Sequence, residues 1–161
     1  MNNVEINKQA RLSQHFTLGE LCKTSVKTAD KNIPSHVHIE NLKRLCGWLE
    51  RLRAAYNLNN KEKIKNNKEE PIVINSGYRS PAVNKAVGGA SNSNHLTGCA
   101  ADIRCYGIEQ ALRYAVILLD IADESKEDFD ELLIEKSAKS IWVHFAVRPE
   151  GNRRKVAFIK T

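Results

Sequence analysis

Residues 93–102 read Ser-Asn-His-Leu-Thr-Gly-Cys-Ala-Ala-Asp, and residues 142–144 read Trp-Val-His. Small residues lie between His95 and Asp102, and His144 follows about forty residues later. Two imidazoles and one carboxylate form a three-ligand set that leaves a fourth tetrahedral position open, which is typical of a catalytic rather than a structural zinc site. We therefore predict one zinc ion per chain, held by His95, Asp102 and His144.

Each of these residues also has a simpler interpretation. A histidine and an aspartate seven residues apart are often a hydrogen-bonded polar pair, and His144 could be a buried structural histidine on a strand. Cys99 and Cys105 are rival zinc ligands, but their spacing is not that of a Cys-x-x-Cys knuckle. Four cysteines in 161 residues do not indicate a disulfide scaffold, so buried free thiols are the alternative.

Length and composition predict a single soluble globular domain, residues 1–161. Hydrophobic residues make up 42% and charged residues 27% of the chain. The net charge of +6 favours an anionic partner such as a cell wall, a lipid headgroup or a nucleic acid. Nucleic acid is the weakest of these, because no basic helix or alternation of basic and aromatic residues is present.

Two kinds of apolar segment are missing from the sequence. Residues 1–12 contain no apolar run of the length that a secretion signal needs, and no stretch approaches the roughly 18 apolar residues of a membrane span. We expect synthesis in the cytoplasm without a signal peptide and no membrane-spanning segment. Action on the cell wall would then require release by another route.

The N-terminal half is predicted to be mainly helical. Thr17 to Glu20 has the form of a capping box and predicts a short helix that ends near Cys22. Apolar residues at a spacing of three and four predict a longer helix over residues 36–56. Residues 57–70, rich in Asn and Lys, are predicted to be a solvated loop, and the apolar run at 71–74 is typical of a buried strand.

The C-terminal half alternates strands with helices. Pro81 is expected to open a short helix that ends at Gly88-Gly89. The later elements are a strand over 100–104, an amphipathic helix whose apolar positions are Ile108, Leu112, Ala115, Val116 and Leu119, a hairpin of 129–135 with 141–147, and an edge strand over 156–159. This order predicts an α+β fold with a small, mainly antiparallel sheet.

Two further polar residues are candidates for chemistry. Glu135 ends a predicted strand, and a carboxylate there could act as general base and then general acid; the alternative is a surface glutamate. Arg79 lies in a turn, and its guanidinium could hold a substrate carboxylate with two hydrogen bonds; the alternative is a solvent-exposed arginine.

Together these segments resemble a known family. Ser-Gly-Tyr-Arg-Ser-Pro at 76–81, Gly88-Gly89, the Ser-x-His-x-x-Gly-x-Ala-x-Asp pattern at 93–102 and Trp-Val-His at 142–144 occur in this order. The chain is similar to the M15 family of zinc D-alanyl-D-alanine carboxypeptidases and peptidoglycan endopeptidases, in particular its small phage-associated and bacterial branch. The segment from Leu12 to Leu21 also resembles that branch.

The resemblance implies a fold and a site. It implies the hedgehog-like zinc peptidase fold and a zinc site at His95, Asp102 and His144. It places Arg79 at the substrate carboxylate or carbonyl and Ser93 close beside the site. We predict that Arg79 takes part in catalysis and in substrate binding, and that Ser93, Tyr78 and Trp142 also bind the substrate.

The resemblance also implies a position for the proton-transferring group. Several family members carry it three residues before the last histidine, where this chain has Ile141, which cannot transfer protons. Hedgehog signalling domains, of related fold, instead carry a glutamate at the end of the preceding strand, and the segment from Phe129 to Glu135 resembles that arrangement. We therefore predict Glu135 as the catalytic acid and base.

The implied reaction is hydrolysis of a peptide bond in peptidoglycan stem peptides or cross-links, at a D-amino acid. The enzyme would be a D-Ala-D-Ala carboxypeptidase or a phage-type endolysin. The alternative is a zinc-containing module that binds cell wall or protein without turnover, as hedgehog relatives do. The resemblance does not distinguish carboxypeptidase from dipeptidase or endopeptidase action, and nothing in the sequence predicts an oligomeric state.

Overall fold

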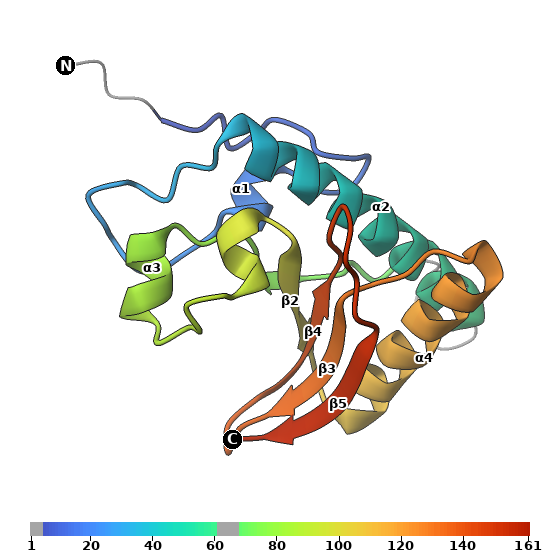
Figure 1. Ribbon diagram of the computed structural model, residues 1–161. Coiled ribbons are helices and arrows are strands. Elements are labelled where there is room, and N and C mark those ends of the chain that lie inside the picture. Colours follow the sequence, from blue (N-terminus) through green and yellow to red (C-terminus); the bar gives the residue numbers. More distant parts are fainter. Residues whose placement is uncertain (1–4, 61–67) are drawn as a thin grey trace.

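The computed structural model describes residues 5–60 and 68–161, and a five-stranded sheet lies at its centre in the order β1–β2–β4–β3–β5 (Figure 1). The strands are β1 (Ile74–Ser76), β2 (Ala100–Cys105), β3 (Glu131–Lys136), β4 (Ile141–Ala146) and β5 (Lys155–Lys160). Neighbouring strands are antiparallel except β3 and β5, which are parallel. The predicted α+β class with a mainly antiparallel sheet is confirmed.

Helices connect and cover these strands. They are α1 (Leu18–Leu21), α2 (His36–Asn59), α3 (Pro81–Ala86), the 3₁₀ helix η2 (Asn94–Thr97) and α4 (Ile108–Ser125). The capping box of Thr17 and Glu20 is present, and Pro81 occupies the first turn of α3 as predicted. In the described part of the chain, no helix has the length and apolar character needed to cross a membrane.

The sheet has one apolar face and one polar face, because successive side chains on a strand point to opposite sides. The core cluster takes Ala101, Ile103 and Cys105 from β2, and Val143 and Phe145 from β4. Figure 1 shows α2 and α4 on one side of the sheet and α3 and η2 on the other. The core residues of α2 and α4 belong to the same cluster, so these helices cover the apolar face.

The polar face carries the residues that the sequence singled out. In the register of the sheet, Asp102 of β2 lies opposite His144 of β4, and His144 lies opposite Leu133 of β3. The next row contains Arg104, Trp142 and Glu135. Alternation along three paired strands thus collects polar groups on the face away from α2 and α4.

The helix α4 was predicted correctly, but only part of its predicted apolar set faces the core: Ala115 is buried there and Leu119 packs against it, whereas the other three are exposed. Ile108, Leu112 and Val116 are 45%, 51% and 55% exposed, whereas Tyr114 and Leu118 are buried. Apolar residues occur on both sides of this helix, so spacing alone did not identify the side that faces the sheet.

Three boundaries also differ from the prediction. The strand expected at 71–74 begins only at Ile74, and α2 extends to Asn59, into the loop expected at 57–70. The part of that loop at residues 61–67 lies outside the described residues. The strand expected from Phe129 begins at Glu131. The single-domain assignment stays a prediction.

Candidate metal centre and active site

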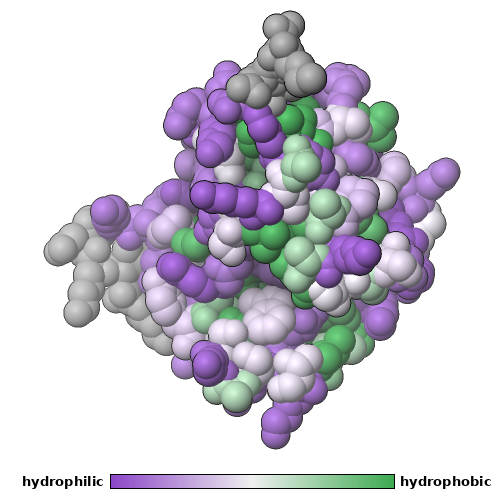
Figure 2. All heavy atoms as spheres, turned by 90° about the vertical axis from the view of Figure 1, so that its left-hand side faces the viewer, coloured by the Kyte–Doolittle hydropathy of each residue, from purple (hydrophilic) through white to green (hydrophobic). Residues whose placement is uncertain are grey.

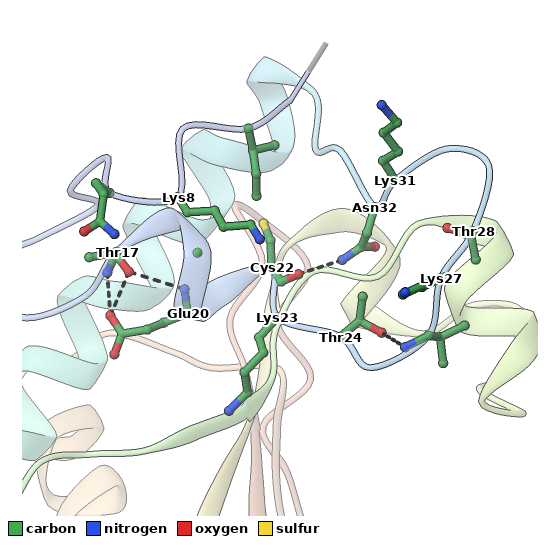
Figure 3. Close-up of a pocket in the computed structure, with 14 residues that line it drawn as sticks. Lys8, Thr17, Glu20, Cys22, Lys23, Thr24, Lys27, Thr28, Lys31 and Asn32 are labelled. Carbon is green, nitrogen blue, oxygen red and sulfur yellow. Dashed lines mark hydrogen bonds between the residues drawn. The ribbon is translucent and has the colours of Figure 1, made fainter. Parts of the chain in front are cut away.

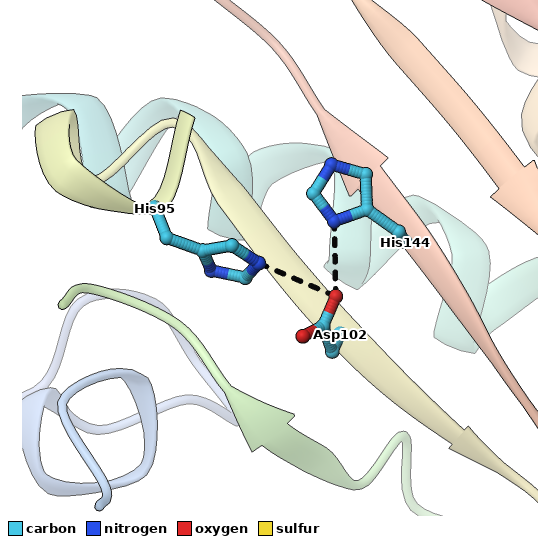
Figure 4. Close-up of side chains that lie close together, drawn as sticks. All are labelled: His95, Asp102 and His144. Carbon is cyan, nitrogen blue, oxygen red and sulfur yellow. Dashed lines mark hydrogen bonds and ion pairs between the residues drawn. The ribbon is translucent and has the colours of Figure 1, made fainter. Parts of the chain in front are cut away.

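Side chains from three separate elements converge at the predicted metal site (Figure 4). His95 comes from η2, Asp102 from β2 and His144 from β4. Both imidazoles approach the same oxygen of Asp102: Nε2 of His95 lies 3.3 Å and Nδ1 of His144 lies 2.9 Å from Oδ1. The three residues offer ligand atoms that all lie within 4.8 Å of one another, so they could hold one metal ion.

The His95 ring is fixed by its second nitrogen. Nδ1 donates to the backbone carbonyl of Gly77 at 2.7 Å. A carbonyl can only accept, so Nδ1 carries a proton, and Nε2 is the nitrogen that faces Asp102. Ser93 caps η2 by accepting from the backbone N–H of His95. Ser93 therefore lies next to His95, where its side chain caps η2.

Gly77 allows the turn beneath His95 to pack closely. A Cβ at this position would lie 2.2 Å from the carbonyl oxygen of Leu21, which accepts the Tyr78 backbone N–H at 2.7 Å. No larger residue fits without moving the turn. Gly98 plays a similar role after η2, where its φ of +74° is in the left-handed region that favours glycine.

His144 is held between two carboxylates. Its Nδ1 faces Asp102, and its Nε2 lies 3.0 Å from Oε2 of Glu131. Burial lowers the pKa of His144, but hydrogen bonds with Asp102 and Glu131 outweigh this and raise it to about 9. The hydrogen bond with His144 in turn lowers the pKa of Glu131 to about 2.

Asp102 is also kept ionised. Its burial acts to raise its pKa, but the charge of His95 and the hydrogen bond with His144 hold the pKa of this carboxyl well below its usual range. Two imidazole nitrogens and an ionised carboxylate oxygen are the donor set that zinc prefers when one position is left for a further ligand. The chemistry of the group therefore fits zinc.

Glu135 shares the polar face with this group but has different surroundings. It lies opposite Trp142 and two positions beyond Leu133, which faces His144. Partial burial is the main cause that raises the pKa of its carboxyl above the ordinary value. A raised pKa brings a carboxylic acid closer to the range in which it can both accept and return a proton.

Arg79 lies at the edge of the group rather than in open solvent. Its Nε donates to Oγ of Ser76 at 2.9 Å, and Nη2 donates to Oδ2 of Asp102 at 3.1 Å. No hydrogen bond from Nη1 to another described residue is found. The guanidinium therefore orients Asp102 and keeps one nitrogen available for a further partner.

The two predicted aromatic contacts differ in exposure. Tyr78 is only 3% exposed and stacks on His38, with ring centroids 4.9 Å apart. Its ring has almost no exposed surface, so the structure does not support its predicted place in substrate binding. Trp142 is partly exposed on the polar face beside Glu135 and can contact a ligand there.

The rival cysteine ligands are not part of the group. Cys105 points into the apolar core, and Cys99 is buried; neither is among the residues that could hold a metal in the described chain. Burial raises the pKa of Cys105 to about 11 and also raises that of Cys99. Both remain neutral thiols, which are poor zinc ligands.

A large hollow lies away from His95, Asp102 and His144. A cavity of about 690 Å³ is bounded by the N-terminal segment and residues 22–32, and it contains none of the metal-binding group. Several lysines line it, but Lys23 and Lys31 point in different directions (Figure 3). The face seen in Figure 2 is mostly hydrophilic, with apolar residues in small groups. Side-chain chemistry, not cavity size, therefore locates the site.

Sequence reasoning missed the direct contact of Glu131 with His144. Glu131, Leu133 and Glu135 alternate on one strand, so the same period of two that brought Glu135 to the polar face also brings Glu131 there. It also missed Asn94, which donates to Glu131 from the position next to His95.

Known proteins share sequence with this chain. The family model described as Peptidase M15 matches residues 14–144. A curated protein named zinc D-Ala-D-Ala carboxypeptidase, from Streptomyces albus G, is 54% identical over 35 residues, which are 22% of this chain and 14% of that protein. The match therefore covers only a small part of that relative. The family model spans most of the chain, which belongs to the peptidase family M15.

Proposed function

We propose that this protein is a zinc-dependent peptidase that binds one zinc ion at His95, Asp102 and His144. The observation that carries the proposal is the convergence of these three side chains beside a carboxylate of raised pKa, Glu135, in a chain of the M15 family. Zinc at this position would supply Lewis-acid chemistry, polarising a peptide carbonyl and acidifying a water molecule.

The residues of the chain would supply the remaining steps. Glu135 would accept a proton from the attacking water and return it to the amine of the leaving group. Arg79 would bind a carboxylate or carbonyl oxygen of the substrate through its remaining nitrogen while it orients Asp102. Trp142 would pack against the substrate on the same face.

The proposed substrate is a peptide bond at a D-amino acid in a peptidoglycan stem peptide or cross-link. The name of the Streptomyces relative supports this substrate class. The net charge of +6 would favour an anionic wall, where we propose that the protein acts.

The test combines metal analysis with digestion of purified peptidoglycan. We expect one zinc ion per chain, removal of zinc and activity together by a chelator, and cleaved stem peptides in the mass spectrum. Zinc content should fall in each of three variants, His95→Ala, Asp102→Ala and His144→Ala. It should stay at the parent level in Cys99→Ser and Cys105→Ser.

Two results would count against the proposal in different ways. Normal zinc content in any two of the three ligand variants would refute the metal site. A zinc-loaded protein that cleaves no stem peptide but still binds peptidoglycan would favour the non-catalytic binding module.

A further inference from the structure

His144 is 7% exposed, and its ring is hydrogen-bonded at both nitrogens. Nδ1 lies 2.9 Å from Oδ1 of Asp102, and Nε2 lies 3.0 Å from Oε2 of Glu131. A carboxylate only accepts hydrogen bonds, and a neutral imidazole carries one proton. The ring can therefore donate from Nδ1 to Asp102 or from Nε2 to Glu131, but not from both. The choice decides which nitrogen can bind a metal.

Glu131 is itself fixed from two other directions. Its Oε2 accepts from Nδ2 of Asn94 at 3.0 Å, and its Oε1 accepts from Nη2 of Arg153 at 3.0 Å. Its side chain is 15% exposed. The carboxylate that faces His144 therefore has a defined orientation, because both of its oxygens are bound.

Asn94 connects this carboxylate to the other histidine. It precedes His95 in η2, and its Nδ2 also donates to Oδ2 of Asp130 at 2.7 Å. Asp130 is fully buried and accepts two hydrogen bonds from the guanidinium of Arg153, at 2.9 and 2.8 Å. These contacts tie the segment that carries His95 to the strand that faces His144.

We infer that Glu131 is a positioning residue, which accepts the Nε2 proton of His144 in a hydrogen bond and so leaves Nδ1 of that ring to bind the metal. The inference rests on the proposed function. Glu131 is not among the residues whose ligand atoms lie within 4.8 Å of one another, so its role is to orient a ligand rather than to be one. Partners of this kind typically change metal affinity by about 10- to 100-fold when they are removed.

Glu135 provides a matched comparison on the same strand and the same face. Both glutamates lie two positions from Leu133, the residue opposite His144, but in opposite directions along β3. Of these two glutamates, only Glu131 has a hydrogen bond to the ring in the described part of the chain. A general effect of negative charge near the metal should therefore appear in variants of both glutamates, whereas orientation of the ring should depend on Glu131.

The test measures zinc affinity of the full chain by competition with a chromophoric chelator at fixed pH. Glu131→Ala should weaken binding by about 10- to 100-fold, and Glu135→Ala should stay close to the parent. Glu131→Gln should recover much of the loss, because its amide oxygen can still accept the Nε2 proton. Long-range ¹H–¹⁵N spectra of the zinc-loaded parent should show a proton on Nε2 of His144 and none on Nδ1.

The outcomes separate this inference from the proposed function. A parent that binds no zinc refutes the metal site itself. If the parent binds zinc, three results would overturn the inference alone. They are a zinc affinity of Glu131→Ala within about twofold of the parent, equal losses of zinc affinity in the two alanine variants, and a proton on Nδ1 of His144 in the zinc-loaded parent. Should Glu131→Ala not fold, Glu131→Gln and the spectra carry the test, and a zinc-loaded Glu131→Gln with the proton on Nδ1 would also overturn it.

Discussion

Replacement of Glu135 by Gln separates proton transfer from every other property of the site. The amide keeps the size of the side chain and its place opposite Trp142 on β3, but it cannot accept a proton from water. No described residue donates a hydrogen bond to the Glu135 carboxylate, so the change leaves no donor without its partner and the fold should be retained. Zinc content should also be unchanged, because Glu135 does not belong to the metal-binding group.

The expected loss of rate follows from the role of the carboxylate. General acid–base catalysis contributes about 10² to 10⁴ in rate, so kcat of Glu135→Gln should fall by at least about 10². Burial raises the pKa of Glu135, and the base must be ionised, so parent activity should fall as the pH decreases through a value above the ordinary 4.5. This low-pH limb should be absent from the residual activity of the variant.

The assay is steady-state hydrolysis of a synthetic stem peptide by zinc-saturated enzyme over a range of pH. Saturation matters because zinc loss at low pH would imitate the same limb. A variant rate within about threefold of the parent would refute the assignment, since proton transfer is expected to contribute about 10² or more. Glu131 would then be the next carboxylate to test.

Three further predictions concern the surroundings of the site. Arg79→Lys should reduce activity while zinc and fold are kept, because an ammonium cannot bond Ser76, Asp102 and a substrate in one plane; full activity would contradict this. Gly77→Ala should lower the free energy of unfolding by about 1–3 kcal/mol in chemical denaturation, because the new methyl would lie 2.2 Å from the Leu21 carbonyl oxygen. The control is Gly47→Ala in α2, where the new methyl would have no atom within 4 Å, so its effect should be neutral or slightly stabilising. Zinc affinity should rise as the pH increases toward about 9, because metal-free His144 must lose a proton to bind, and affinity that is independent of pH between 6.5 and 8.5 would contradict the pKa of about 9.

The sequence identified three side chains that the structure brings together, because the pattern that contains them is local and specific. The pattern fixes the spacing of His95, Asp102 and His144 along the chain. The alternation of side chains on the strands then brings Asp102 and His144 to one face of the sheet. The exposed apolar residues in the predicted set of α4 have a physical cause of another kind. Leu112 and Val116 are apolar but exposed, and only the packing of the whole sheet shows that Tyr114 and Leu118 face the core instead.

The contacts that support the ligands could not be predicted in the same way. The bond from His95 to the Gly77 carbonyl depends on the path of a turn, and the burial of Tyr78 depends on its stacking against His38 in α2. Both contacts join residues that are distant in sequence, and no sequence pattern pairs them. Sequence patterns identify donors and acceptors, while the pairing among them is set by tertiary structure.

The two glutamates of β3 show how one strand can supply two different functions. Glu131 is hydrogen-bonded to His144, and this contact lowers its pKa to about 2, which keeps it a charged acceptor at any pH where the enzyme would work. Glu135 lacks that contact, and its burial raises its pKa. A group that must hold a ring should not change its protonation, whereas a group that must move a proton has to change it in each cycle. The opposite pKa shifts therefore favour orientation of the ligand by Glu131 and proton transfer by Glu135. With the roles exchanged, the carboxyl of lowered pKa would have to take up a proton in each cycle, and the carboxyl without a hydrogen bond to the ring would have to orient it.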